Sequence, residues 1–274
     1  ALVNYSSLQN MLSTCQELKD GIHPKTKRIH SGLIQLGQQQ HRMAVRTPNW
    51  AKIPRPNSFG QAAKLDDFKF EKNFRQAFIP TEGYKFSICD FAQNQLRIIA
   101  DQADEHKMVA EFNKGDKADL YRATAAAILG KPMDQVTKNE RQDAKVWVLS
   151  FSFAVGAGVY MKQKLEDTRE YTPLEICKAE RNAFFDLYTG LRPWHKAQVE
   201  QVKNYNYIFT PAGRKIYFHP ECDIYTEAIN FPICATEVDG AKLALARIFR
   251  KLKKEKLRAR LIGFVYDEIV IESH

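Results

Sequence analysis

Three carboxylates interrupt apolar segments of the chain that otherwise have the pattern of buried β-strands. Asp267 and Glu268 stand side by side in the middle of LIGFVYDEIVIE, at residues 261–272. Asp90 ends an apolar run within YKFSICDFAQNQLRIIA, at residues 84–100, and a run with helical periodicity begins directly after it. Ionised carboxylates are costly beside buried strand residues unless they are paired or bind a cation. Two such placements in one chain predict a shared metal site.

Composition limits the class of protein. A chain of 274 residues with 44% hydrophobic residues can bury a substantial core, as one large domain or two smaller ones. No run approaches the roughly 18 uninterrupted apolar residues of a membrane span, and no N-terminal export signal is visible. The five cysteines are odd in number and widely separated, which favours a reducing compartment. We expect a cytoplasmic protein, outside the membrane, and the net charge of +9 favours a polyanionic partner.

Hydrophobic periodicity predicts strands together with segregated helices, which is an α+β fold. Residues 31–62, rich in Gln, Pro, Arg and Asn, are expected to form a long irregular connection or short strands. Helices are predicted at 5–18, at 98–164 with breaks at 113–116 and 130–132, and at 173–188, 193–205 and 236–257. Strands are predicted at 74–79 and 84–89, and hairpins at 207–218 and 261–272.

The segment RQDAKVWVLSFSF, at residues 141–153, places Arg141, Lys145, Leu149 and Phe153 four residues apart. On a helix these residues form one ridge, with two cations toward its N-terminus and two apolar groups beyond. Such a ridge suits a triphosphate at one end and a base at the other, because cations neutralise phosphate oxygens and apolar side chains receive the face of a base. The alternative is an ordinary amphipathic helix with a solvated first turn. The spacing alone leaves both interpretations open.

Three segments, in this order, match a known family. DFAQNQLR at 90–97 is similar to DYSQIELR, RQDAKVWVLSFSFA at 141–154 to RxxxKxxxFGxxYG, and VYDE at 265–268 to VHDE. The chain therefore resembles the polymerase region of family A DNA polymerases, which include bacterial DNA polymerase I and related phage and organellar enzymes. Similarity in the connecting segments, such as PNWAKIP at 48–54, extends the resemblance from about residue 5 to residue 274.

The resemblance implies an α+β fold with an antiparallel-sheet palm, a helical fingers subdomain and a thumb that is largely absent. Residues 1–30 would form the base of the thumb, 31–100 the first part of the palm, 101–200 the fingers and 201–274 the second part of the palm. Because most of the thumb is missing, we expect the chain to be either a fragment or one subunit of a split polymerase. A phage would be one source of such a divergent protein. A second chain or missing segment would then supply the thumb and the C-terminal end.

The resemblance also implies template-directed DNA synthesis, with primer-template DNA and deoxynucleoside triphosphates as partners. Two Mg²⁺ ions would activate the primer hydroxyl and stabilise the leaving pyrophosphate. Asp90 and Asp267 match the family's metal-binding aspartates, the carbonyl of Phe91 would complete the site, and Glu268 would adjust it from beside the metals. Arg141 and Lys145 match residues that grip the triphosphate, and Lys145 is also a candidate proton donor to pyrophosphate.

Further residues match family positions around the substrates. Those at the incoming nucleotide are Gln93, Gln95, Tyr121, Leu149 and Phe153. Those at the DNA are Arg42, Arg97, Asn230 and Tyr266, of which Arg97 supports either the primer end or the fold of its own motif. The hairpin at 207–215 is expected either to touch the duplex or to be an ordinary surface hairpin.

The departures from the family pattern concern the substrates rather than the metals. The family's glutamate that excludes ribose is Gln95 here, its aromatic under the nascent base is Leu149, and a tyrosine is Phe153. Histidines are replaced by Tyr121 and Tyr266, and Thr226 and Cys234 replace an arginine and a glutamine on either side of Asn230. Sugar discrimination is therefore expected to weaken but persist. A catalytically decayed, DNA-binding replisome subunit and an enzyme that makes or copies RNA remain the alternatives.

Overall fold

The chain forms two compact units in a computed structural model, which describes residues 2–38, 42–53, 74–168, 171–219, 221, 223–265 and 267–274. The first unit comprises Ala1–Phe91 and Gly240–His274, and the second comprises Ala92–Asp239. The elements of the first unit are α1 (Leu2–Asp20), β1 (Gly32–Ile34), β2 (Ala44–Arg46), β3 (Lys85–Cys89), β6 (Ala259–Val265) and β7 (Glu268–Ser273). Helix α10 (Ile224–Lys254) begins in the second unit and ends in the first.

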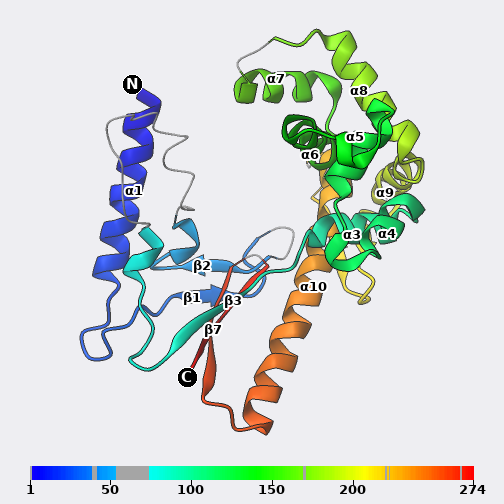
Figure 1. Cartoon of the computed structure of the whole chain (residues 1–274). Helices are drawn as coiled ribbons and strands as arrows, with labels where there is room; N and C mark the ends of the chain where they lie inside the picture. Colours follow the sequence, from blue (N-terminus) through cyan, green and yellow to red (C-terminus); the bar gives the residue numbers. More distant parts are fainter. Residues whose placement is uncertain are drawn as a thin grey trace. The chain divides into compact units, whose positions relative to one another are not determined.

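An antiparallel sheet of order β3-β7-β6 is the centre of the first unit (Figure 1). The central strand β7 pairs with β3 from Cys89 opposite Ile269, and with β6 from Val265 opposite Glu268. Phe264 and Ile269 lie in a buried cluster with Ala241, from the part of α10 that belongs to this unit. Strands far apart in the sequence thus meet at one sheet because their apolar faces share this core.

Gly263 allows an aromatic ring to lie against β6. A Cβ atom at this position would stand 2.4 Å from the Trp50 ring, so any larger residue would displace either the ring or the strand. The pairing of β6 with β7 also shifts between Leu261 and Gly263, as it does at a β-bulge. The glycine therefore positions the segment before the turn that carries Asp267.

Glu272 of β7 is fully buried and ionised. Its carboxylate accepts hydrogen bonds from the Thr81 backbone N–H at 2.7 Å and the Thr81 hydroxyl at 2.9 Å, and from Arg260 at 2.6 Å and Arg28 at 3.2 Å. Burial opposes the charged form, but these hydrogen bonds outweigh burial and lower the pKa of Glu272 to about 2. The network ties the start of the chain, the segment before β3 and both strands of the C-terminal hairpin together.

This network predicts a loss of stability in acid. Because the pKa of Glu272 is lower in the folded than in the unfolded state, its contribution is complete above about pH 4.5 and disappears as the pH falls toward about 2. Glu272→Gln is expected to lower the free energy of unfolding by about 2 kcal/mol at neutral pH and to flatten its acid dependence. Urea unfolding at pH 7, 4 and 3 measures both effects. Exposed Glu255→Gln is the control, and equal acid dependence in wild type and Glu272→Gln would contradict the prediction.

The second unit is mainly helical, with a two-stranded sheet. Its elements are α3 (Asn94–Gln102), α4 (His106–Phe112), α5 (Leu120–Leu129), α6 (Lys138–Ser152), α7 (Ala157–Thr168), α8 (Leu174–Leu187), α9 (Leu191–Tyr205), β4 (Tyr207–Phe209) and β5 (Lys215–Tyr217). Helices α5 and α6 lie side by side (Figure 1). Phe151 of α6 is fully buried against Tyr160 and Phe184, and the Trp147 indole donates to the Tyr160 hydroxyl at 3.0 Å. This core holds α6 in place.

The predicted α+β class is confirmed, as are the helices at 5–18, 173–188 and 193–205 and the strand at 84–89. The two predicted hairpins are β4–β5 and β6–β7, and the helical stretch at 98–164 forms from α3 to α7 with its predicted breaks. Short strands β1 and β2 lie in the segment 31–62, whose residues 39–41 and 54–62 are outside the described ranges. None of the described helices is both long enough and apolar enough to cross a membrane.

One element prediction is wrong, and one is right in type but not in its bounds. The segment predicted as a strand at 74–79 is a short 3-10 helix, Phe74–Ala77, in which Phe78 N–H donates to the Arg75 carbonyl at 3.2 Å. No strand of the described part of the chain pairs with it, so its backbone bonds locally. The helix predicted at 236–257 begins at Ile224 instead and continues through Pro232. Burial of Ile229 and Ile233 outweighs the hydrogen bond that the proline removes.

Candidate active site

Asp90 and Asp267 lie at the same end of the β3-β7-β6 sheet. Asp90 directly follows Cys89, the last residue of β3, and Cys89 pairs with Ile269. Asp267 lies in the turn between β6 and β7, because Val265 pairs with Glu268 across that turn. The antiparallel register therefore brings two aspartates that are far apart in the sequence to neighbouring strand ends.

The three carboxylates at this sheet end differ in exposure. Asp90 is exposed, whereas Asp267 and Glu268 are half-buried. The Arg75 guanidinium stands 3.9 Å from the Glu268 carboxylate, which partly neutralises it. Phe91, next to Asp90, is 36% exposed, so its backbone is not sealed inside the core. This end of the sheet is thus open to solvent and carries negative charge.

The donor atoms at this end fit a hard divalent cation. Mg²⁺ prefers oxygen ligands and is commonly held by one or two carboxylates together with substrate phosphates and water. Asp90 and Asp267 offer two such carboxylates. Among the residues that the structure describes, no group of three or more His, Cys, Asp or Glu side chains is placed to hold a metal ion.

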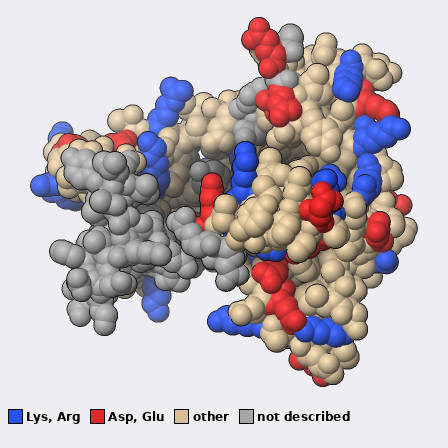
Figure 2. Space-filling view, turned by 90° about the horizontal axis from the view of Figure 1, so that it is seen from above, with Lys and Arg blue, Asp and Glu red and all other residues tan. Residues whose placement is uncertain are grey.

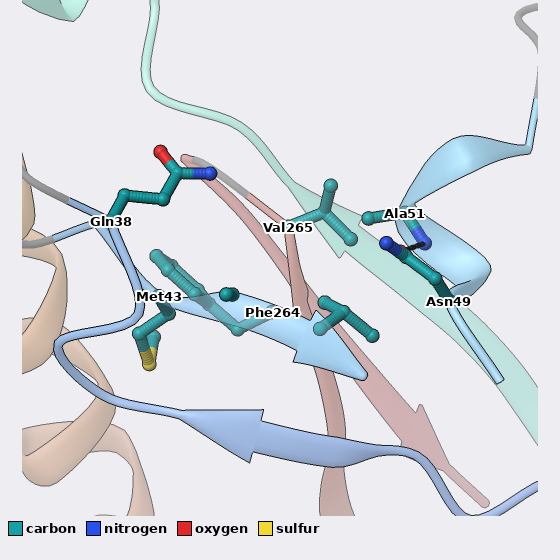
Figure 3. A pocket seen from close by; sticks show the side chains of 8 residues that line it. Gln38, Met43, Asn49, Ala51, Phe264 and Val265 are labelled. Carbon is teal, nitrogen blue, oxygen red and sulfur yellow. Dashed lines mark hydrogen bonds between the residues drawn. The ribbon is translucent and has the colours of Figure 1, made fainter. Parts of the chain in front are cut away.

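A small pocket borders the strand that leads to Asp267 (Figure 3). Phe264 and Val265 of β6 line it, together with Met43 and Asn49, whose side chain accepts a hydrogen bond from the Ala51 N–H at 3.1 Å. Its volume of about 80 Å³ has room for a few water molecules but not for a nucleotide.

Among the predicted DNA-binding residues of this unit, Arg42 lies just before β2 with a half-buried side chain, and Tyr266 is outside the described residues.

Helix α6 in the second unit carries the predicted cationic ridge. Thr137 and Glu140 cap its N-terminus reciprocally, which fixes the helix start three residues before Arg141. Arg141, Lys145 and Leu149 follow one another along α6, and Phe153 is its C-terminal cap residue. Leu149 is 42% exposed, so an apolar side chain is presented to solvent beyond the two cations. The helical spacing predicted for this segment is therefore present.

The two cations of the ridge have different environments. Arg141 donates from Nε to the Asp119 carboxylate at 2.8 Å, and its guanidinium lies 5.4 Å from the centre of the Tyr121 ring. Burial of Asp119 opposes its ionisation, but its hydrogen bonds, chiefly from Arg141, prevail and hold its pKa below the usual value. Within the described ranges the half-buried Lys145 takes part in no hydrogen bond or ion pair. Lys145 is the cation left available for an anionic ligand.

Charge elsewhere on the surface is mixed. On the face drawn in Figure 2, Lys and Arg side chains are interspersed with Asp and Glu rather than gathered in one field. Many of the described basic side chains have acidic partners, such as Lys164 with Glu180 at 2.9 Å and Arg214 with Asp239 at 2.7 Å. The net charge of +9 therefore says less about anion binding than the local pairing of each cation does.

The segment after Asp90 is held in one conformation at the start of α3. Gln93 adopts a left-handed backbone with φ of 52°, and its side-chain Oε1 is buried without a hydrogen-bond partner in the described part of the chain. The Arg97 Nε donates back to the Ala92 carbonyl at 2.9 Å. The Gln95 amide donates to Glu237 of α10 at 3.0 Å, and Glu237 is only 2% exposed.

The comparison with known proteins agrees with this arrangement. A sequence profile described as DNA polymerase family A matches residues 1–274. The chain belongs to DNA polymerase family A. The DNA polymerase I of Aquifex aeolicus is 30% identical over 268 residues, covering 97% of this chain and 42% of that protein. The DNA polymerase I of Chloroflexus aurantiacus is 28% identical over 280 residues, covering 99% of this chain and 28% of that protein.

A solved family A structure shares the fold. The POL domain of Pol1 from M. smegmatis, in complex with DNA primer-template and dNTP, superposes with a TM-score of 0.83 at 23% identity. The match covers 98% of this chain and 45% of that one. The chain thus spans less than half the length of these relatives. At this identity the likeness establishes the fold alone.

Two residues of this family A chain that position the site were not predicted from its sequence. Asp119 orients Arg141, and Glu237 orients Gln95. In each pair the two residues are too far apart in the sequence for helical or strand periodicity to relate them. The resemblance implies a role for Tyr121 but none for Asp119, which lies two residues before it. Asn230 also has a local partner, because the Cys234 thiol donates to its side-chain oxygen at 2.8 Å.

Proposed function

We propose that this chain catalyses template-directed DNA synthesis, adding deoxynucleotides to a primer 3′-hydroxyl. The observation that carries the proposal is the position of Asp90 and Asp267 at one sheet end in a chain that belongs to DNA polymerase family A. The relatives named DNA polymerase I support the same activity. In this proposal residues 31–100 and 201–274 form the palm, 101–200 the fingers and 1–30 the base of the thumb.

Asp90 and Asp267 hold the divalent ions in this proposal, and the Phe91 carbonyl adds a third protein oxygen. When two Mg²⁺ ions are bound, they supply a lowered pKa at the primer hydroxyl and charge compensation for the leaving oxygens. Glu268 lies beside the ligands, and Arg75 restrains its charge at 3.9 Å. The protein's contribution is to aim carboxylate oxygens from two strand ends that the sheet holds rigid.

The cationic ridge of α6 receives the triphosphate. Arg141, oriented by Asp119, and Lys145, which pairs with none of the described residues, neutralise phosphate charge as it develops, and Lys145 donates a proton to the leaving pyrophosphate. Leu149 and Phe153 offer apolar surface to the base. Tyr121, whose ring lies under Arg141, and Gln93 border the nucleotide. Four residues are assigned to DNA contacts: Arg42, Arg97, Asn230 and Tyr266.

Single-nucleotide primer extension tests the proposal. The chain is mixed with a labelled primer on a template, Mg²⁺ and one deoxynucleotide at a time. We expect extension by one nucleotide with the complementary deoxynucleotide and none, or far less, with the other three. DNA binding without extension by any nucleotide, in Mg²⁺ or Mn²⁺, would refute synthesis and indicate a decayed, DNA-binding subunit instead.

The Gln95–Glu237 contact predicts how the sugar is selected. Gln95 has nearly the size of the family's glutamate without its charge, and Glu237 fixes its amide in place. We expect Gln95→Ala to reduce the preference for deoxy- over ribonucleotides by about tenfold, because the space for a 2′-hydroxyl opens. Gln95→Glu is expected to lower activity, since two carboxylates would then face each other.

The measurement is the ratio of kcat/KM for a deoxynucleotide to that for its ribonucleotide. Gln102→Ala is a matched control, because Gln102 lies on the same helix and its amide also bonds α10, at the Thr236 hydroxyl, 3.0 Å away. The exchange Gln95→Glu with Glu237→Gln should recover the activity lost in Gln95→Glu. An unchanged ratio in Gln95→Ala would show that Gln95 does not border the 2′-position of the nucleotide's sugar.

A further inference from the structure

The β4–β5 hairpin of the second unit has one buried and one aromatic face. Ile208 and Ile216 pair with each other and point inward, at 2% and 0% exposure, into a cluster with Val202 and Phe231. Strand alternation places the neighbouring residues on the opposite face. That outer face consists of four residues: Tyr207, Phe209, Lys215 and Tyr217.

The outer rings form a continuous row around a lysine. Tyr207 lies 5.4 Å from Phe209 and 6.0 Å from Tyr217, measured between ring centres. The Lys215 ammonium stands 3.5 Å from the centre of the Tyr207 ring and 5.0 Å from that of Tyr217. Tyr205, at the end of α9, extends the row at 6.0 Å from Tyr207. We call these five residues the aromatic face.

The aromatic face is open to solvent and is not needed for the core. Phe209 is 56% exposed, Tyr217 66% and Tyr205 57%. The hairpin is already anchored by Ile208 and Ile216 on its inner side. Exposed rings gathered into one patch usually mark a binding surface.

The charge around the aromatic face favours an anionic partner. Residues 201–220 contain no Asp or Glu but include Lys203, Arg214 and Lys215. Arg214 is held by Asp239, whereas the Lys215 ammonium lies among the rings. A lysine at the centre of the patch argues against a protein partner, because the buried centres of protein interfaces are depleted in lysine. Rings interleaved with basic residues are the usual means of binding unpaired nucleotides.

We propose that the aromatic face binds a single-stranded segment of nucleic acid, with its bases stacked on the rings and its phosphates near Lys215. The proposal rests on the hairpin alone and does not require the chain to be an active polymerase. If the proposed synthesis also holds, the segment is an unpaired stretch of template or displaced strand.

Fluorescence anisotropy of the full chain with a labelled thymidine oligonucleotide of about 12 nucleotides tests this proposal. A second probe of equal length carries abasic sugars, so that it keeps the phosphates but offers no bases. We expect Tyr217→Ala and Phe209→Ala each to weaken binding of the thymidine probe about tenfold and to leave the abasic probe almost unchanged. Lys215→Met should weaken both probes and reduce the salt dependence of binding.

Tyr171→Ala is the matched control, since Tyr171 is 70% exposed and lies outside the hairpin. Thermal unfolding of each variant verifies that the fold is retained. Equal affinity of the wild type for both probes, or unchanged binding in both ring variants, would overturn the proposal. Asp267→Ala separates this proposal from the proposed synthesis, because it should bind the thymidine probe like the wild type even where extension is lost.

Discussion

Replacing Asp267 by asparagine is expected to slow primer extension by about a thousandfold. The variant keeps the size of the side chain in the turn between β6 and β7 but removes the charge that holds a divalent ion. Asp267 is half-buried in a turn and is not part of the buried cluster of the sheet, so the isosteric change should leave folding largely unaffected. A neutral amide binds a divalent ion more weakly than a carboxylate does, so less positive charge would be held beside the reacting phosphates.

Single-turnover extension with saturating nucleotide measures this loss, and Mn²⁺ binding followed by electron paramagnetic resonance measures the site itself. We expect Asp267→Asn to weaken Mn²⁺ binding as well as the rate, and Asp90→Asn to behave alike. Glu268→Gln, the adjacent carboxylate, is the matched comparison and should lose no more than about tenfold, since the proposal places Glu268 beside the metals rather than among their ligands. A full rate in Asp267→Asn, or equal losses in Asp267→Asn and Glu268→Gln, would remove Asp267 from the reaction.

The second large effect is expected at Lys145. Lys145→Met should lower the rate of nucleotide addition by about a hundredfold, because the cation that stabilises the developing pyrophosphate charge is lost. Arg141 cannot replace it, since its guanidinium is already held by Asp119 at 2.8 Å. The apolar stem that methionine retains keeps the packing of α6, so the loss reports charge rather than fold.

Lys145→Arg distinguishes the two roles assigned to this residue. The arginine keeps the positive charge but does not release a proton near neutral pH, so it should restore triphosphate binding and not the full rate. The pH dependence of the rate should change in Lys145→Arg if proton donation is lost. Lys138→Met, in the first turn of the same helix, is the control and should act like the wild type. If Lys138→Met and Lys145→Met lose activity equally, the positive charge of α6 acts as a general field and not through Lys145.

Much of the candidate site could be predicted because its residues lie in short sequence patterns that are typical of strands and helices. Asp90 and Asp267 stand out as carboxylates at the ends of apolar strands, and α6 follows from its four-residue spacing and its Thr137 cap. The resemblance to family A then assigned roles to these positions, and the family membership is now established. The assigned roles themselves await the measurements described above.

The partners of these residues could not be predicted in the same way. Asp119 with Arg141, and Gln95 with Glu237, join elements whose spacing in sequence carries no period. The same holds for Glu272, which reads as the polar end of a strand but lies fully buried among Thr81, Arg28 and Arg260. Such contacts arise when packing removes a charge from water and brings donors from other elements within reach of it.

The amino-acid sequence by itself determined the strands, the helices, the positions of the acidic and basic side chains, and the family to which the chain belongs. Only the tertiary structure decided that α10 runs unbroken through Pro232, that residues 74–77 turn rather than pair, and that the hairpin at 207–217 turns its rings to solvent. The physical reason is that sequence patterns report interactions between residues close together in the chain, whereas packing joins residues that are far apart in it. Periodicity records which face of an element is apolar, whereas burial, pairing and exposure depend on which other elements come to lie against that face.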